Sequence, residues 1–230
     1  MAKKGKRYTE GRATLEEEKQ YSVSEACELI TKFPKAKFDE SVDIAINLGV
    51  NPRKAEENIR GTVTLPHGSG KTIRVAAFCT GDDAKAAEEA GADFVGGKDL
   101  VEKIQGGWLD FDAAVATPSS MALVGRIGKL LGPRGLMPNP KVGTVTPDIA
   151  KAIEAIKSGR VEFRLEKTGI MHIGIARVSF GPEKIAENVN AVIEAVLKAK
   201  PQTSKGVYLK AVNLSSTMGP GVTLDAVALR

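Results

Sequence analysis

The pattern of hydrophobic and polar positions changes along the chain. In residues 41–49, SVDIAINLG, apolar side chains occupy every second position, which predicts a strand with one buried face. From residue 72 to residue 157, apolar runs such as TIRVAAFCT alternate with helix-like segments such as DDAKAAEEAG. Residues 160–180 return to strand-like runs. Residues 181–200 then carry one apolar stripe at helical spacing, which predicts a long amphipathic helix.

These patterns predict an α/β protein with two domains. Strands that alternate with helices over short connections are typical of a parallel sheet with helices on both faces. Strands that follow one another without helices, as near both ends of this chain, are typical of antiparallel pairing. We therefore expect a discontinuous α+β domain with an antiparallel sheet from residues 1–67 and 160–230. A Rossmann-like, three-layer α/β domain is expected to be inserted between them, in residues 68–159.

Glycine and proline add local detail. The KTG segment between the runs RVEFRLE and IMHIGIARVSF predicts a β-hairpin. Residues 118–132, PSSMALVGRIGKLLG, are expected to form one helix that starts near its proline. The two crossings between the domains, PHGSGK and IKSGR, contain glycine, so they would permit the domains to move as rigid bodies.

The net charge of +5 is unevenly distributed. Residues 68–159 hold 11 basic and 11 acidic side chains, so the whole excess lies in residues 1–67 and 160–230. A domain that carries this excess is suited to bind a polyanion such as nucleic acid. No apolar run approaches the ~20 residues of a membrane helix, and no signal-peptide segment follows the basic N-terminus. We therefore expect a cytoplasmic protein without a membrane partner.

The sequence lacks the chemical motifs of common enzymes. HGSGKT has Leu65 where a phosphate-binding P-loop has its first glycine, and a strand rather than a helix is expected after it. No GxGxxG or GxSxG motif occurs, and the two histidines and two distant cysteines form no metal-binding pattern. We therefore expect no catalytic site, no cofactor and no metal, and two reduced, buried cysteines. The rival hypothesis is a small α/β enzyme that binds a phosphorylated ligand in the central domain.

Three segments outside the central domain combine residue types that bind RNA. KAKFDES places Lys37 and Phe38 at a strand entrance, where the ring could stack on a nucleotide or pack in the core. The predicted hairpin offers basic and polar side chains, and SSTMGPG offers small residues that a ribose–phosphate chain can approach closely. A solvated tip and a plain turn are the structural alternatives for these two. Their candidate residues are Arg164, Lys167, Thr168, His172, Thr217, Met218 and Gly219.

A fourth basic segment lies in the central domain. Residues 128–144, GKLLGPRGLMPNPKVGT, contain three prolines, which fix φ and remove amide donors, so the segment differs from a P-loop. A stiff, auxiliary basic loop that faces RNA backbone or the other domain fits better. Its basic residues, with one just before it, are Arg126, Lys129, Arg134 and Lys141.

Many of these segments resemble the bacterial L-one family of large-subunit ribosomal proteins. The resemblance rests on LGPRGLMPNPKVGTVTPDI and extends to GKRY, AKFDESVDIAINLG, NIRGTVTLPHG, EEAGADFVGG, FDAAVATP, KTGIMH and STMGPGV. It implies the two-domain fold and binding to large-subunit ribosomal RNA in the mobile stalk beside the E site. It further implies assistance to the release of deacylated tRNA, and repression through the leader of the protein's own mRNA, which mimics the ribosomal site. A repressor that works only outside the ribosome is a further alternative.

The resemblance also implies which residues contact RNA. Glu40 would accept a hydrogen bond from a ribose hydroxyl or a base amine, and Met218 would lie against a sugar or a base. The family usually has Asn-Asp where this chain has Leu165 and Glu166, so the chain departs from the family at that contact. The implied contacts are Phe38, Glu40, Ser41, Lys167, Thr168, His172, Thr217, Met218 and Gly219.

Overall fold

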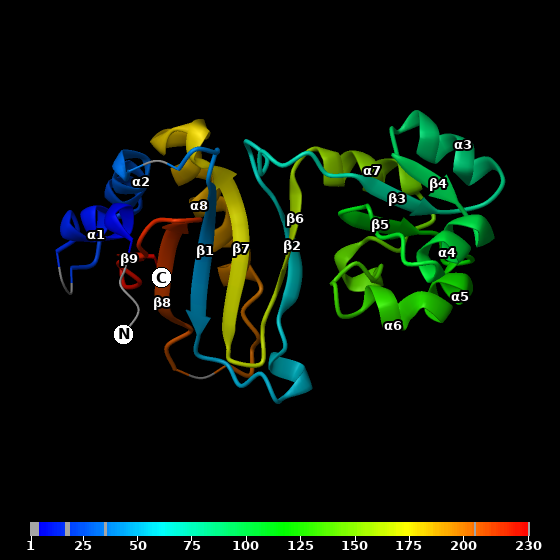
Figure 1. Cartoon of the computed structure of the whole chain (residues 1–230). Coiled ribbons are helices and arrows are strands. Elements are labelled where there is room, and N and C mark those ends of the chain that lie inside the picture. Colours follow the sequence, from blue (N-terminus) through cyan, green and yellow to red (C-terminus); the bar gives the residue numbers. More distant parts are fainter. Residues whose placement is uncertain (1–4, 17–18, 35, 205, 230) are drawn as a thin grey trace. The chain divides into compact units, whose positions relative to one another are not determined.

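The chain forms two compact units (Figure 1). One contains a four-stranded and a two-stranded sheet, and the other contains a three-stranded sheet. The computed structural model describes residues 5–16, 19–34, 36–204 and 206–229. The terminal unit consists of residues 1–70 and 161–230, and the inserted unit consists of residues 71–160. The mixture of an antiparallel and a parallel sheet confirms the predicted α/β class with an inserted α/β part.

The first crossing between the units belongs to the terminal unit as far as Gly70, whereas the sequence placed the boundary after His67. The side chain of the fully buried Asn188 accepts the His67 N–H and donates to the Gly68 carbonyl, at 3.2 and 3.0 Å. Gly70 packs so closely against Arg177 and Phe180 that an added Cβ would lie 2.8 Å from each. These contacts fix residues 67–70 to the terminal unit.

A four-stranded sheet with the order β7-β1-β8-β9 forms the centre of the terminal unit. β1 (Ser41–Leu48) lies between β7 (Ile170–Arg177) and β8 (Leu209–Ser216), and β9 (Val222–Leu224) pairs with β8, all antiparallel. The alternation predicted for β1 is confirmed. Its buried side chains are Val42, Ile44, Ile46 and Leu48.

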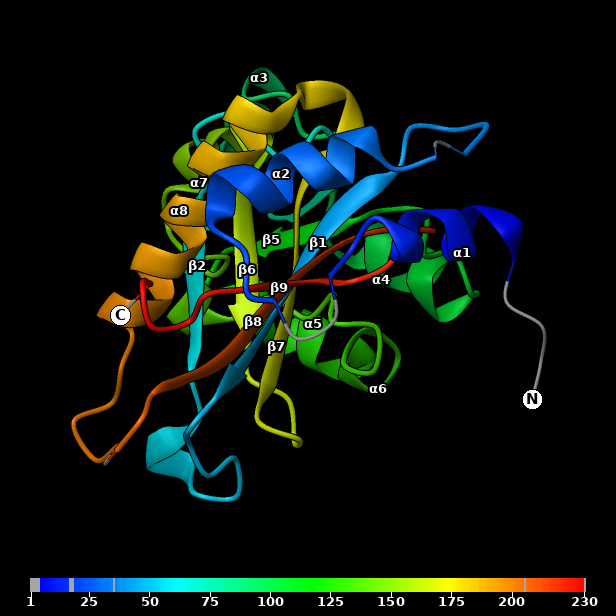
Figure 2. The ribbon, with the colours of Figure 1, turned by 90° about the vertical axis from the view of Figure 1, so that its left-hand side faces the viewer.

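Two helices cover the buried face of this sheet. A capping box of Ser22 and Glu25 starts α2 (Val23–Lys32), and the predicted apolar stripe lies on α8 (Pro182–Lys198). The two helices lie next to each other (Figure 2), and their apolar sides enter one core with the sheet. A shorter helix, α1 (Lys6–Ala13), packs at the edge of the unit through the buried Gly11.

The predicted hairpin around KTG is wrong. The turn itself forms, since the Glu166 N–H donates to the Ile170 carbonyl and the Gly169 N–H to the Glu166 carbonyl, both at 3.0 Å. The strands on its two sides, however, belong to different sheets. β6 (Arg160–Arg164) pairs with β2 (Arg60–Thr64), next to η1 (Ala55–Glu57), whereas β7 pairs with β1. Gly61 permits the β2–β6 pair, because an added Cβ would lie 2.7 Å from Phe163 Cζ.

The inserted unit contains a parallel sheet with the order β4-β3-β5. β3 (Val75–Phe78) is central, between β4 (Phe94–Gly96) and β5 (Ala113–Ala116). α3 (Asp82–Glu89) and α7 (Ile149–Lys157) contribute to one apolar cluster, and α4 (Lys98–Gln105) contributes to a second. The two clusters confirm the predicted three layers.

The single helix predicted for residues 118–132 is wrong. The chain there forms α5 (Met121–Val124), the 3-10 helix η2 (Gly125–Ile127) and α6 (Gly128–Leu131). Gly125 and Gly128 lie at the two junctions, and glycine costs about 1 kcal/mol relative to alanine inside a helix. The downstream segment adds η3 (Pro140–Val142), and the terminal unit contains η4 (Val178–Phe180) after β7. None of the helices among the described residues could span a membrane.

Candidate nucleic-acid interface

Two segments that are far apart in the sequence meet at one end of the four-stranded sheet. The Ser41 N–H donates to Thr217 Oγ1 and the Thr217 N–H donates to the Ser41 carbonyl, both at 3.0 Å. These bonds join the start of β1 to the end of β8. The structure thereby brings the KFDES segment and the STMGPG turn together, as a shared site requires.

Glu40 links the same two segments from inside. Its buried carboxylate accepts hydrogen bonds from the Ala36 N–H at 2.9 Å, the Ser216 hydroxyl at 2.7 Å and the Met218 N–H at 3.0 Å. Burial raises the pKa of Glu40, but these hydrogen bonds, together with the charge of Arg7, bring it below its usual value. Both carboxylate oxygens are thus engaged within the protein.

Large apolar side chains are exposed on both segments. Phe38 is 55% exposed and Met218 is 53% exposed, so the alternative that Phe38 packs in the core is wrong. Lys37 is exposed beside Phe38. At this end of the sheet, Lys37 can contact phosphates, and the Phe38 ring and the Met218 thioether can contact the flat faces of nucleotides.

Gly219 sets the shape of the STMGPG turn. Its N–H donates to Ser216 Oγ at 3.1 Å, and a Cβ added to Gly219 would overlap that same oxygen. Ser216 Oγ in turn donates to Glu40. Any side chain at position 219 would therefore disturb the hydrogen bonds that hold Met218.

The residues predicted around the KTG turn lie apart from those of the KFDES segment and the STMGPG turn. β1 runs from the site at Ser41 to Leu48, whose N–H donates to the Gly169 carbonyl at 3.0 Å. The seven residue-to-residue rises from Ser41 to Leu48 span roughly 24 Å, so the exposed Lys167 and Thr168 lie at the opposite end of the sheet. His172 is exposed between the two ends and pairs with Ala45, while Arg164 is exposed on the other ladder, in β6.

The departure from the family pattern at residues 165 and 166 has a structural basis. Leu165 is buried in the core of the terminal unit, and its N–H donates to the Ile59 carbonyl. Glu166 is exposed at the turn. The leucine is therefore a packing residue, and only the position of Glu166 faces solvent.

Asp43 lies on the outward side of β1, next to His172 and Arg177. Burial raises the pKa of this carboxyl, and the two basic groups lower it to a smaller extent. Gly174 is opposite Asp43 in the ladder, and an added Cβ there would lie 3.1 Å from Asp43 Oδ1. The sequence pattern did not distinguish Asp43 from an ordinary solvent-facing strand residue.

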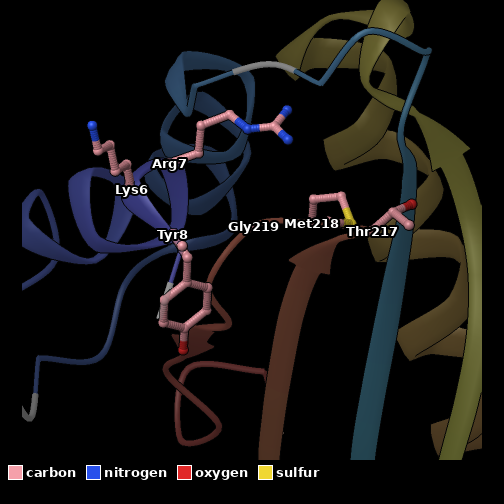
Figure 3. A pocket seen from close by; sticks show the side chains of 7 residues that line it. Lys6, Arg7, Tyr8, Thr217, Met218 and Gly219 are labelled. Atoms are coloured by element: carbon pink, nitrogen blue, oxygen red, sulfur yellow. The ribbon is translucent and has the colours of Figure 1, made fainter. Parts of the chain in front are cut away.

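A pocket of about 610 Å³ adjoins the STMGPG turn (Figure 3). One wall is the STMGPG turn. The other is the start of α1, in the basic N-terminal segment, where the sequence predicted no RNA contact. The signal that could have found this wall is the run KRY, two cations followed by an aromatic ring. The lining residues are Gly5, Lys6, Arg7, Tyr8, Thr217, Met218 and Gly219.

The four basic residues predicted to form the auxiliary surface of the inserted unit are all exposed. They do not lie in an irregular loop throughout, because three of them fall in short helical turns. Arg126 is in η2, Lys129 in α6 and Lys141 in η3, and only Arg134 is in the irregular part. Leu130 is 43% exposed among them.

The titratable groups of the described residues include no metal-binding cluster of three or more His, Cys, Asp or Glu. Cys27 and Cys79 are free and buried. Burial raises the pKa of Cys27 to about 12 and also raises that of Cys79, where nearby acidic groups add to the effect. Both thiols therefore stay protonated and unreactive near neutral pH.

Residues 30–220 match the sequence profile of the ribosomal protein L1p/L10e family. The chain belongs to this family. It is 56% identical, over all 230 residues and 98% of the relative's length, to the large ribosomal subunit protein uL1 of Solidesulfovibrio magneticus. Members of this family are structural, non-enzymatic proteins of the ribosome, and membership places the chain in the cytoplasm. The enzyme hypothesis for the inserted unit is therefore wrong.

Proposed function

We propose that this protein binds ribosomal RNA of the large subunit, chiefly through the terminal unit. The relative in Solidesulfovibrio magneticus is named as a large-subunit protein, which supports the same assembly here. The observation that carries the proposal is the exposure of Phe38 and Met218 on two segments that Glu40 joins. Exposed apolar side chains can pack against the faces of unpaired bases, and neighbouring cations can bind the phosphates of the same nucleotides.

Each residue at this end of the sheet has a distinct role in the proposal. Phe38 and Met218 lie flat against a base or a ribose, and Lys37 binds a phosphate. Gly219 lets the ribose–phosphate chain approach the backbone. Thr217 and Ser41 hold each other through two backbone N–H donors, and Glu40 positions both segments.

A second contact lies along the sheet toward Lys167 and Thr168, with His172 between the two ends. Because the two ends are roughly 24 Å apart, one structured RNA that follows β1 and β7 would reach both. Arg164, on the neighbouring ladder, adds a positive charge. This second contact contributes mainly phosphate binding, which carries little sequence information.

We assign the exposed basic residues of the inserted unit to RNA backbone, including that of E-site tRNA. Contacts of this kind would allow a stalk protein to assist the release of deacylated tRNA. The same terminal site would bind the leader of the protein's own mRNA, which would repress its translation. The residues of this auxiliary surface are Arg126, Lys129, Arg134 and Lys141.

Binding of the full-length protein to large-subunit ribosomal RNA fragments tests the proposal. We expect one fragment to bind specifically and Met218→Ala to weaken that binding, while Val227→Ala, which trims another exposed apolar side chain (67% exposed), leaves it unchanged. The mRNA leader should compete for the same site. Equal affinity for all fragments, or equal loss in both variants, would contradict a specific site at Met218.

A further inference from the structure

The pocket beside the STMGPG turn is too large to be a packing defect. Its volume of about 610 Å³ lies within the ~300–1,000 Å³ typical of sites for small organic ligands. The residues predicted to bind RNA supply only one of its walls. The opposite wall runs from Gly5 to Tyr8, and so far it enters the site only through the charge of Arg7 acting on Glu40.

The two walls are fixed relative to each other. Gly11 of α1 is buried against Pro220, and an added Cβ would lie 3.1 Å from Pro220 Cδ and 3.6 Å from the Phe33 ring. Pro220 belongs to the same STMGPG turn as Met218. The close contact at Gly11 therefore holds α1 at a set distance from the turn.

The chemistry of the pocket is cationic and aromatic. Figure 3 shows the Arg7 side chain reaching over the pocket, while Lys6 points outward at its rim and Tyr8 lies on the side of α1 below them. Arg7 is close enough to Glu40 for its charge to act on that carboxylate. Seven of the described residues line the pocket, and they include two cations and no acid. Such a pocket suits an anionic group joined to a flat ring.

We infer that this pocket holds one unstacked nucleotide of the bound RNA, with its base against Tyr8 and Met218 and its phosphate on Arg7. Lys6 adds a second positive charge at the rim. Aromatic side chains bind splayed-out bases in this way, and a guanidinium is well matched to phosphate. The inference rests on the proposed function. It adds α1 to the RNA site as a second wall that contacts one particular nucleotide.

A cycle of protein and RNA changes tests the pocket. In the specific RNA fragment, each nucleotide of the protected region is replaced in turn by an abasic one, and affinity is measured for the wild type and for Tyr8→Ala. We expect one position at which the abasic change weakens wild-type binding by about 5- to 150-fold, the range of base stacking on an aromatic ring. In Tyr8→Ala the same change should cost much less, since the two losses are coupled.

Salt dependence tests the phosphate contact separately. Arg7→Met should lower the slope of log affinity against log salt by about 0.7–0.9, as expected for one lost phosphate. Arg12→Met is the matched control, because Arg12 is exposed in the last turn of the same helix and does not line the pocket. An equal decrease in both variants would overturn the contact at Arg7.

Gly11→Leu tests whether the geometry of the pocket, and not only its charge, determines binding of the nucleotide. It should push α1 away from Pro220 while leaving Arg7 and Tyr8 in the chain, so sensitivity to the abasic position should disappear. If the wild type binds RNA specifically but Tyr8→Ala and Gly11→Leu keep the wild-type abasic profile, the pocket inference is wrong and the proposed function stands. If the wild type binds no fragment specifically, the proposed function itself fails.

Discussion

The carboxylate of Glu40 accepts the backbone N–H of Met218 at 3.0 Å, across 178 positions of sequence. The same carboxylate accepts the Ala36 N–H and the Ser216 hydroxyl, so a single buried group organises the segments before β1 and after β8. A buried carboxylate that accepts three hydrogen bonds is well compensated, whereas one that loses a partner is costly. The exposed Phe38 and Met218 depend on this group for their positions.

Replacement of Glu40 by Gln should therefore weaken both the fold and the proposed RNA binding. The amide places a donor against a donor, which leaves a buried group unsatisfied at a cost of about 1–3 kcal/mol in the free energy of unfolding. Urea denaturation measures this cost, and the affinity for the specific RNA fragment should fall with it. Glu28→Gln, at an exposed pair on α2, is the control and should change neither quantity appreciably.

The stabilising effect of Glu40 should depend on pH. Its pKa in the folded protein is lowered, so its contribution is fully present above the unfolded glutamate value of about 4.3. That contribution is lost as the pH falls from there through the lower folded pKa. The difference in unfolding free energy between the wild type and Glu40→Gln should thus shrink below about pH 4.3. A constant difference from pH 7 to pH 3 would show that the charge of Glu40 is unimportant.

Phe38→Ala should separate RNA binding from stability. Because the ring is 55% exposed, its loss should change the unfolding free energy by no more than about 0.5 kcal/mol. RNA affinity should fall by about 1–3 kcal/mol if the ring stacks on a base. Phe163→Ala, which empties a buried position in β6, should show the opposite balance, with about 3–5 kcal/mol of lost stability.

Two glycines of the same turn offer a matched comparison. Gly219→Ala introduces a Cβ that overlaps Ser216 Oγ, so we expect it to displace Met218 and reduce RNA affinity at least tenfold, about 1.4 kcal/mol. Gly221→Ala places its Cβ in open space, with no atom within 4 Å, and should bind as the wild type does. Equal behaviour of the two variants in a binding titration would contradict the role of the turn.

Asn188→Ala should destabilise the terminal unit near the first crossing. The fully buried amide accepts the His67 N–H and donates to the Gly68 and Ile175 carbonyls. Its removal leaves these groups unsatisfied, which costs about 1–3 kcal/mol or more. Hydrogen exchange at the His67 amide should accelerate. Asn213→Ala, which removes an exposed bond to Thr223, is the control and should leave that amide protected.

The sequence by itself determined the elements with a clear period and the type of the two larger sheets. The alternation in β1, the capping box of α2 and the stripe of α8 are local patterns, so each predicts its own element and its buried face. The strand–helix order of the inserted unit likewise indicated a parallel sheet. The long proline- and glycine-rich motif indicated the family, which the family match confirms.

The tertiary structure decided which elements become neighbours. It assigned β6 to β2 instead of β7, brought Glu40 beneath Met218, and set Lys167 at the far end of the sheet from Thr217. It also placed Arg7 and Tyr8 across a pocket from Met218. These relations depend on hydrogen bonds and contacts between residues far apart in the chain. Residue periodicity records the burial of each segment, but it does not specify the partner against which that segment packs.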